Sequence, residues 1–317
     1  MVPIESARAA FAGTPEFAVP SLKALIDAGV KVDCVLTQPD RRAGRGRTLT
    51  QSPVKQFAVS HNIDVLQPVS LDGDCRNRLP EQRPDVLVVV AYGLILPDWL
   101  LDWPKIAPIN VHASLLPRWR GAAPIQQSIL SGDRETGVSI MRMTRGLDCG
   151  PVYRQRATPL GPVENAGELH DRLSSLGAEL LVATLPAILS AALEPQPQDD
   201  TAASYAPKLE KRHALIDWKQ SAAELERKVR AYNPWPVAEA RTAAGDRLRI
   251  WAAESCGDAS DATPGAVVAT PERELVVATG SGLLRLTQVQ PPGGRVMTAV
   301  AYLAAHDVRG LVFVGPE

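Results

Sequence analysis

The chain has 317 residues, of which 45% are hydrophobic and 22% charged, and its formal net charge is -1. This length is long for one hydrophobic core and suits two domains, and the balanced charge gives no global signature of nucleic-acid binding. No apolar run approaches the roughly 20 residues of a membrane span, and the N-terminus lacks the basic stretch and apolar core of a signal peptide. We therefore expect no membrane partner.

The residues that usually bind metals are dispersed along the chain. None of the five histidines forms an i, i+4 pair, and the four cysteines lack the paired spacing of a zinc site. The cysteines are Cys34, Cys75, Cys149 and Cys256. This pattern predicts a reduced, cytoplasmic protein with no metal site.

The chain begins with the pattern of a parallel α/β sheet. Ala9–Ala12 is predicted as a strand, Glu16–Ala28 as a helix and Val32–Leu36 as the next strand. A strand, helix and strand in this order imply a right-handed crossover and an open sheet. The turn at residues 13–18 lacks the Gly-x-Gly-x-x-Gly fingerprint, which argues against a dinucleotide cofactor.

An arginine-rich segment, Thr37–Lys55, follows the second predicted strand. Glycines and prolines interrupt it, so we expect a mobile surface loop. Its clustered arginines are Arg41, Arg42, Arg45 and Arg47. A solvated charged loop and a phosphate-binding arm both fit this composition, because guanidinium groups suit phosphate oxygens.

The next elements lead to a possible ligand site. Helices are predicted at Val54–His61 and Asp72–Leu79, with a short strand, Val65–Gln67, between them. Asp85–Ala91 is an unbroken apolar run typical of a central parallel strand. Because open α/β sheets bind ligands at strand carboxyl ends, the turn Tyr92-Gly93 is either an ordinary turn or part of a pocket.

The candidate catalytic residues lie between Ile109 and Asp148. Asn110 and His112 stand two apart in a predicted strand, so their side chains share one face. Asp148, between glycines at 146 and 150, could return to the same place on a flexible turn. A buried strand histidine and a turn carboxylate are each more often structural, but an amide, an imidazole and a carboxylate together resemble an acyl-transfer site.

The rest of the chain completes the sheet and adds a second domain. Helices are predicted at 122–130, 164–193 and 222–231, and strands at 136–143 and 151–157. Pro186 should kink or end the long helix, which is followed by a proline-rich, semi-rigid linker. Short strands at 248–251, 265–268, 274–278 and 283–290, with a helix at 297–305, predict a small barrel of the oligonucleotide-binding type. We expect domains at 1–193 and 208–317, joined by residues 194–207.

Several motifs resemble those of the 10-formyltetrahydrofolate-dependent formyltransferases, along nearly the whole chain. The matching motifs are Phe11-Ala12-Gly13-Thr14-Pro15, Asn110-Val111-His112, Ser114-Leu115-Leu116-Pro117, Arg120-Gly121-Ala122-Ala123-Pro124, Leu147-Asp148 and Asn233-Pro234-Trp235-Pro236. The resemblance implies an α/β catalytic domain with an open, Rossmann-like, mostly parallel sheet. It implies catalytic roles for Asn110, His112 and Asp148.

The resemblance also implies the ligands. The folate site would comprise Tyr92, Gly93, Leu94, Ser114, Leu115, Leu116 and Pro117. The formyl donor would be 10-formyltetrahydrofolate, and the acceptor the methionine amine of initiator methionyl-tRNA. The arginine-rich segment would then be an arm that inserts at the tRNA acceptor end, and the barrel would bind tRNA. The alternative is a relative that formylates an amino sugar nucleotide or a ribonucleotide amine, and in either case we expect a monomer.

Overall fold

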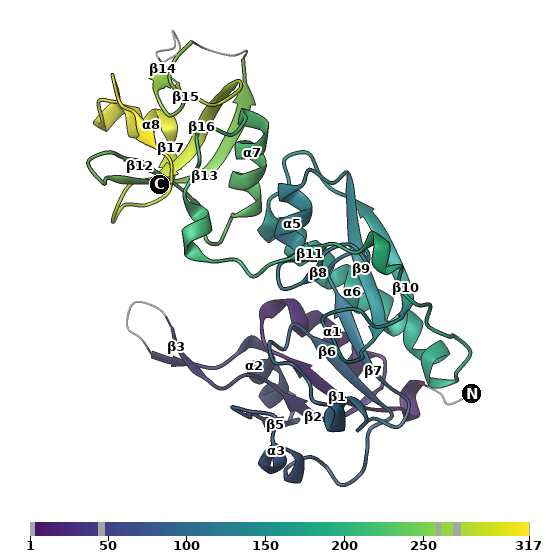
Figure 1. Ribbon diagram of the computed structural model, residues 1–317. Coiled ribbons are helices and arrows are strands. Elements are labelled where there is room, and N and C mark those ends of the chain that lie inside the picture. Colours follow the sequence, from purple (N-terminus) through teal and green to yellow (C-terminus); the bar gives the residue numbers. More distant parts are fainter. Residues whose placement is uncertain (1–3, 44–47, 258–260, 269–273, 317) are drawn as a thin grey trace. The chain divides into compact units, whose positions relative to one another are not determined.

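The structure is a computed structural model that describes residues 4–43, 48–257, 261–268 and 274–316 (Figure 1). Its internal contacts divide the chain into two compact units. Unit 1 comprises residues 1–124, 135–159 and 170–206, and unit 2 comprises residues 125–134, 160–169 and 207–317. Each unit is therefore assembled from segments that are separated in the sequence. The predicted domain limits stay a prediction.

Unit 1 is built on a seven-stranded sheet with the order β10-β9-β7-β6-β1-β2-β5. Its strands are β1 (Arg8–Gly13), β2 (Lys31–Leu36), β5 (Asp64–Leu66), β6 (Val86–Val90), β7 (Ala107–His112), β9 (Glu135–Arg142) and β10 (Val152–Pro159). The first five strands pair in parallel, whereas β9 runs antiparallel to β7 and β10 antiparallel to β9. The predicted mostly parallel, open α/β sheet is confirmed.

The helices also follow the sequence pattern closely. They are α1 (Val19–Asp27), α2 (Pro53–Ser60), α3 (Gly73–Asn77), α4 (Asp98–Leu101), α5 (Pro124–Leu130) and α6 (Ala166–Leu189), with short 3-10 turns η1 (Ile4–Ser6) and η2 (Glu16–Ala18). Helix α2 begins where Ser52 accepts a hydrogen bond from the Lys55 backbone and Pro53 occupies the first turn. These are the cap and the proline position that favour a helix start.

Helix α6 does not end at Pro186 but continues to Leu189. By length and composition it is long and apolar enough to cross a membrane, although the sequence pattern suggested no such run. In its most apolar 18-residue window, 56% of the helix is buried inside the structure. Its buried face includes Leu169, Leu173 and Leu185, which are fully covered. These leucines show that one face of α6 packs in the interior of the protein.

The arginine-rich segment contains regular structure that the sequence pattern did not predict. Strand β3 (Arg41–Ala43) pairs antiparallel with β4 (Thr48–Thr50), so the segment forms the two arms of a hairpin. Arg41 and Arg42 lie on β3, whereas Arg45 and Arg47 lie outside the described residues. The expectation of a loop throughout this segment is therefore wrong at residues 41–43 and 48–50, whereas its mobility stays a prediction.

The proline-rich stretch after α6 belongs to unit 1 as far as Ala206. It contains a backbone bridge between Gln196 and Val152, a 3-10 turn η3 (Asp200–Ala202) and strand β11 (Tyr205–Ala206). Strand β11 pairs in parallel with β8 (Arg120–Gly121). Within the predicted semi-rigid linker, these contacts hold residues 196–206 against unit 1, and the linker limits stay a prediction.

Unit 2 contains an antiparallel sheet that nearly closes into a barrel. Its strands are β12 (Ala238–Thr242), β13 (Arg247–Cys256), β14 (Val267–Val268), β15 (Leu275–Ala278), β16 (Leu283–Gln290), β17 (Met297–Thr298) and β18 (Phe313–Val314). The order is β14-β15-β16-β13-β12-β18, and a bridge between Ala266 and Val312 links its two ends. The other elements are η4 (Lys211–Ala214), α7 (Ala222–Ala231) and α8 (Ala299–Ala305). The predicted barrel is confirmed.

Candidate active site

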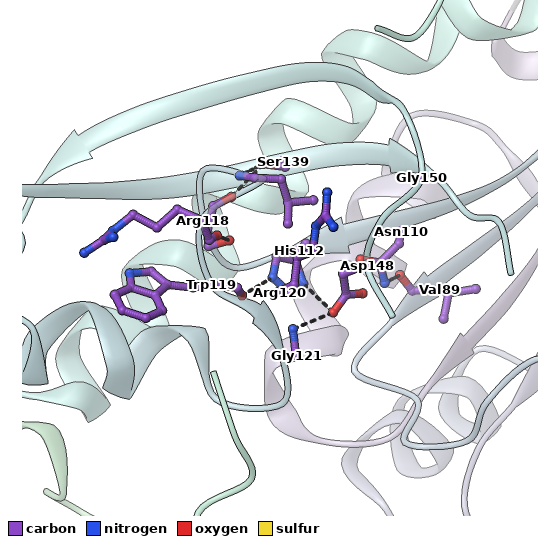
Figure 2. Close-up of polar contacts among 12 residues, drawn as sticks. Val89, Asn110, His112, Arg118, Trp119, Arg120, Gly121, Ser139, Asp148 and Gly150 are labelled. Carbon is purple, nitrogen blue, oxygen red and sulfur yellow. Dashed lines mark hydrogen bonds and ion pairs between the residues drawn. The ribbon is translucent and has the colours of Figure 1, made fainter. Parts of the chain in front are cut away.

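Strand β7 places Asn110 and His112 in the interior of unit 1. All of its residues are buried, and Asn110 and His112 retain 9% and 7% exposure. Asn110 pairs with Val89 of β6 in the strand register, and its Nδ2 donates to the Val89 carbonyl at 3.1 Å (Figure 2). Because a carbonyl only accepts hydrogen bonds, this contact fixes which end of the amide faces β6. The other end, Oδ1, is buried and has no partner within the described residues.

The tautomer of His112 is fixed in the same way. Its Nε2 lies 2.9 Å from the Trp119 carbonyl oxygen, so Nε2 must carry a proton and donate it. Its Nδ1 faces Asp148 Oδ2 at 3.8 Å (Figure 2). This pair attracts when Nδ1 is also protonated, and 3.8 Å is longer than a direct hydrogen bond. Nδ1 is therefore the ring nitrogen that can exchange a proton with a bound molecule.

Asp148 is held in place by a backbone donor. The Gly121 amide donates to Asp148 Oδ2 at 2.8 Å, and the Asp148 side chain is only 16% exposed. Gly121 has a φ of +116°, and a Cβ there would lie 2.6 Å from the Ala206 carbonyl oxygen. No other residue type fits this position, because a side chain would clash and the conformation favours glycine. The predicted trio of Asn110, His112 and Asp148 is thus brought together.

The turn after β7, Ser114 to Pro117, is pinned to the neighbouring antiparallel strands. The Ser114 hydroxyl donates to the Arg118 carbonyl at 2.6 Å and so closes the turn. Ser139 of β9 donates to the Ser114 carbonyl at 2.6 Å, and Gln155 of β10 donates to the Leu116 carbonyl at 2.8 Å. Ser114 and Leu116 are buried, whereas Leu115 and Pro117 are half-buried. These contacts fix the turn beside the trio.

The second predicted ligand-binding turn, Tyr92 to Leu94, follows β6. The Tyr92 ring is buried in a cluster with residues such as Leu36 and Leu96, and burial raises the pKa of its hydroxyl. Its carbonyl accepts hydrogen bonds from Thr14 at 3.1 Å and from Gln38 at 3.3 Å. Gly93 is exposed and has a φ of +85°. The Tyr92 side chain thus serves the core, and the exposed part of this turn is Gly93.

Three contributors to the site carried no sequence signal of their role. Trp119 acts through its carbonyl and Gly121 through its amide, groups that every non-proline residue has. Gln198 donates to the carbonyls of Asp148 at 2.8 Å and of Gly150 at 2.6 Å, yet lies 50 positions after Asp148 in a stretch that reads as a linker. Only the pairing of distant segments reveals it.

Metal ligands do not gather in the described part of the chain. Among those residues, no group of three or more His, Cys, Asp and Glu side chains could hold a metal ion.

Comparison with family models assigns nearly the whole chain. Residues 7–185 match the model described as "Formyl transferase", and residues 208–307 match "Formyl transferase, C-terminal domain". A protein from Methylococcus capsulatus named "Methionyl-tRNA formyltransferase" is 52% identical over 304 residues, which cover 96% of this chain and 98% of the relative. The chain belongs to the formyltransferase family.

A further relative is similar in sequence, and solved structures are similar in fold. A Coxiella burnetii (strain RSA 493) protein named "Methionyl-tRNA formyltransferase" is 48% identical over 95% of this chain and 96% of its own length. An N-formyltransferase from Helicobacter canadensis, solved with folinic acid and dTDP-3-aminofucose, has a TM-score of 0.62 at 19% identity and covers 88% of this chain and 98% of that one. HypX from Aquifex aeolicus, solved with tetrahydrofolic acid, has a TM-score of 0.59 at 16% identity and covers 94% of this chain but only 46% of that one. At these identities the solved structures show a shared fold.

Proposed function

We propose that this formyltransferase transfers the formyl group of 10-formyltetrahydrofolate to the α-amino group of methionine on initiator methionyl-tRNA. The trio of Asn110, His112 and Asp148 carries the proposal, because it supplies a fixed amide beside a ring and carboxylate pair. The 52% identical relative named "Methionyl-tRNA formyltransferase" directs the choice of acceptor. The product would be N-formylmethionyl-tRNA for translation initiation. The cytoplasm is the expected compartment and a monomer the expected state.

Asn110 is suited to the oxygen of the formyl group. When the amine attacks, the carbonyl carbon becomes tetrahedral and negative charge develops on its oxygen, which then needs donors. The Asn110 amide nitrogen carries two hydrogens and uses one of them on the Val89 carbonyl. The second is available to the developing oxyanion. Its Oδ1, for which the described part of the chain offers no partner, could accept a hydrogen bond from the attacking amine.

His112 and Asp148 are suited to the proton traffic. The new carbon–nitrogen bond forms first and gives the tetrahedral carbon, and the bond from that carbon to the folate nitrogen then breaks. The amine therefore loses a proton and the folate nitrogen gains one. Nε2 of His112 is committed to the Trp119 carbonyl, which leaves Nδ1 to donate to the oxyanion or to relay a proton. Asp148, 3.8 Å away, stabilises the imidazolium form.

The folate would lie beside the carboxyl ends of β6 and β7, which are neighbouring parallel strands. Backbone groups of Gly93 and Leu94 on one side, and of the Ser114–Pro117 turn on the other, would contact the pterin. The pinned turn supports this proposal, because an immobile backbone edge loses little entropy when it binds a ring.

The tRNA would be bound by the arginine-rich hairpin and by unit 2. A protein with a net charge of -1 needs a concentrated set of cations to hold a polyanion, and Arg41, Arg42, Arg45 and Arg47 form the densest set in the sequence. Antiparallel pairing of β3 with β4 supports the proposal, because it places Arg41 and Arg42 on a defined strand. The barrel of unit 2 would follow the acceptor stem.

A comparison of amine acceptors tests this function. The protein is incubated with 10-formyltetrahydrofolate and, separately, with charged initiator tRNA, the same tRNA uncharged, an amino sugar nucleotide and a ribonucleotide amine, while release of tetrahydrofolate is followed. We expect rapid release with the charged tRNA alone. Faster release with the amino sugar nucleotide or the ribonucleotide amine would replace the proposed acceptor.

A further inference from the structure

Residues 196–206, which we call the strap, bridge the two loops that carry the active-site groups. At one end, the Gln196 and Val152 backbones exchange two hydrogen bonds of 2.8 Å, just after the Asp148 turn. At the other end, the Arg120 amide donates to the Ser204 carbonyl at 2.9 Å and the Ala122 amide to the Ala206 carbonyl at 2.9 Å. The strap is therefore fastened on both sides of the site.

The run from Trp119 to Gly121 is the part of the site that the strap holds. It supplies both backbone groups that contact the catalytic pair, the Trp119 carbonyl on His112 and the Gly121 amide on Asp148. The Trp119 amide donates to the Ser204 hydroxyl at 3.1 Å, within the strap. Movement of the strap would thus move the partners of both His112 and Asp148.

Gln198 connects the strap to the catalytic turn from the opposite side. Its Nε2 donates to the carbonyls of Asp148 at 2.8 Å and of Gly150 at 2.6 Å. Its Oε1 accepts from Nε of Arg120 at 3.0 Å, so both ends of the amide are engaged and it has one orientation. All the hydrogen-bonding capacity of the Gln198 amide nitrogen is directed at the backbone around Asp148.

Arg120 is a fixed anchor for Gln198. Its side chain is 3% exposed, and its second guanidinium nitrogen donates to Asp200 of the strap at 2.7 Å. Burial disfavours the charge of Arg120, but hydrogen bonds with Asp200 and Tyr205 outweigh burial and raise the pKa of the guanidinium. Arg120 therefore stays charged, and its planar fork holds two strap residues at a set spacing.

Two residues of the site have backbones that need such support. Trp119 has a φ of 63° and Asp148 a φ of 51°, a left-handed conformation that is unfavourable for non-glycine residues. Such conformations persist where surrounding contacts over-determine them. The strap supplies contacts of this kind to both residues.

We propose that Gln198, anchored by Arg120, is a positioning residue that fixes Asp148 against His112 for formyl transfer. The role of Asp148 in this statement rests on the proposed function, whereas its placement by Gln198 does not. A misplacement of about 1 Å can cost about 100-fold in rate, so two hydrogen bonds to the backbone of the catalytic turn are enough to matter.

Three variants separate positioning from simple support. Gln198→Ala removes the side chain, and Gln198→Glu keeps its shape and its contact with Arg120 but has no N–H for the two carbonyls. We expect both to lower kcat for methionyl-tRNA at least 10-fold, with little change in the KM of either substrate or in Tm. The control is Gln196→Ala, an exposed strap glutamine whose side chain bonds only the Glu194 carbonyl within the described residues, and it should retain wild-type kcat.

A second measurement is independent of the reaction. Because the Gly121 amide donates to Asp148, its hydrogen exchange, followed by NMR, should become at least 10-fold faster in both Gln198 variants and unchanged in Gln196→Ala. Wild-type kcat or unchanged exchange in Gln198→Glu would overturn the positioning role. The two proposals can fail separately. If the wild-type protein does not formylate methionyl-tRNA but Gly121 exchange is still faster in the Gln198 variants, the proposed function is rejected and the positioning role stands.

Discussion

At His112, a backbone carbonyl decides which ring nitrogen is available for chemistry. The Trp119 oxygen binds Nε2–H, so Nδ1 is the nitrogen that faces Asp148. A side chain that supplied the hydrogen bond to Trp119 without an ionisable nitrogen would separate the structural task of the ring from its chemical task. Glutamine is such a side chain, because its amide nitrogen can occupy the place of Nε2.

His112→Gln should therefore fold normally and fail in catalysis. We expect kcat to fall about 100-fold or more, because a donor at the developing oxyanion is lost, while Tm changes little. The measurements are steady-state formylation of methionyl-tRNA and a thermal melt. A variant that melts like the wild type and also turns over like it would show that His112 is only a packing residue.

At the scale of single residues, sequence patterns placed two residues of the site together only where these lie close to each other in the sequence. Asn110 and His112 share a strand, so a spacing of two was enough to place them on one face. Asp148 was reached only through its glycine bracket and the family resemblance. Gln198 lies 50 positions beyond it and acts through a loop that has no periodicity, so no local pattern could identify it.

At the scale of elements, the base of the arginine-rich hairpin is held by a closed set of hydrogen bonds. Lys55 of α2 donates to Asp40 and to Gln67, and Gln67 donates to Asp40, each at 2.7 Å. The Lys55 and Asp40 side chains are only 17% and 18% exposed, so solvent screens their pairing weakly. This set joins the residue before β3 to a helix and to the end of β5.

The attachment of the hairpin should depend on the charge of Asp40. Hydrogen bonds from Lys55 and then Gln67 lower the pKa of the Asp40 carboxyl. A carboxyl with a lowered folded-state pKa stabilises the structure above its unfolded value, near 4, and this contribution is lost as the pH falls through the folded value. We expect amide protection in β3 and β4, followed by NMR, to be constant from pH 7 to about pH 4 and to fall below that.

Asp40→Asn should reproduce that loss at neutral pH. We expect a several-fold higher KM for charged tRNA and an unchanged rate of any formyl-donor hydrolysis measured without tRNA, because the hairpin would be loosened while the site stays intact. Asp27→Asn, in an exposed ion pair with Lys23, is the matched control and should behave like the wild type. Equal loss of both activities in Asp40→Asn would mean that this set of hydrogen bonds supports the site itself.

At the scale of the whole molecule, each unit has a core of its own. In unit 2, buried residues from the barrel and α7 surround Trp218, which stacks on Phe313 with ring centroids 5.6 Å apart. The Trp218 indole N–H is buried without a partner among the described residues. Trp218 therefore stabilises unit 2 through apolar contacts, and its unsatisfied N–H donor reduces this stabilisation.

Trp218→Ala should destabilise unit 2 by about 3–5 kcal/mol, because it leaves a large cavity in a closed core. Urea unfolding followed by far-UV circular dichroism should show an earlier transition for this unit. Val300→Ala, at an exposed position of α8, should shift stability by no more than about 0.5 kcal/mol. Similar midpoints for the two variants would contradict a core that depends on Trp218.

Local sequence patterns predicted the fold class, but they did not predict which segments of the chain make up each unit. Unbroken apolar strands such as Val86–Val90 predicted the parallel sheet, and short strands between turns predicted the barrel. Residues 125–134 and 160–169 group with unit 2, although in the sequence they lie before residues 170–206, which belong to unit 1. Such grouping depends on tertiary contacts, which neither propensity nor periodicity encodes.

The strap also sets the order in which the active site can be completed during synthesis. A ribosome releases residues from the N-terminus onward, so the three side chains proposed to be catalytic are all available once Asp148 has emerged. The groups that clamp the Asp148 turn and the Trp119–Gly121 run arrive only with residues 196–206. A nascent chain that ends before Ala206 therefore contains Asn110, His112 and Asp148 without the full set of strap contacts. If Gln198 positions Asp148 as proposed, we expect formyl transfer to reach its full rate only after the strap has been synthesised.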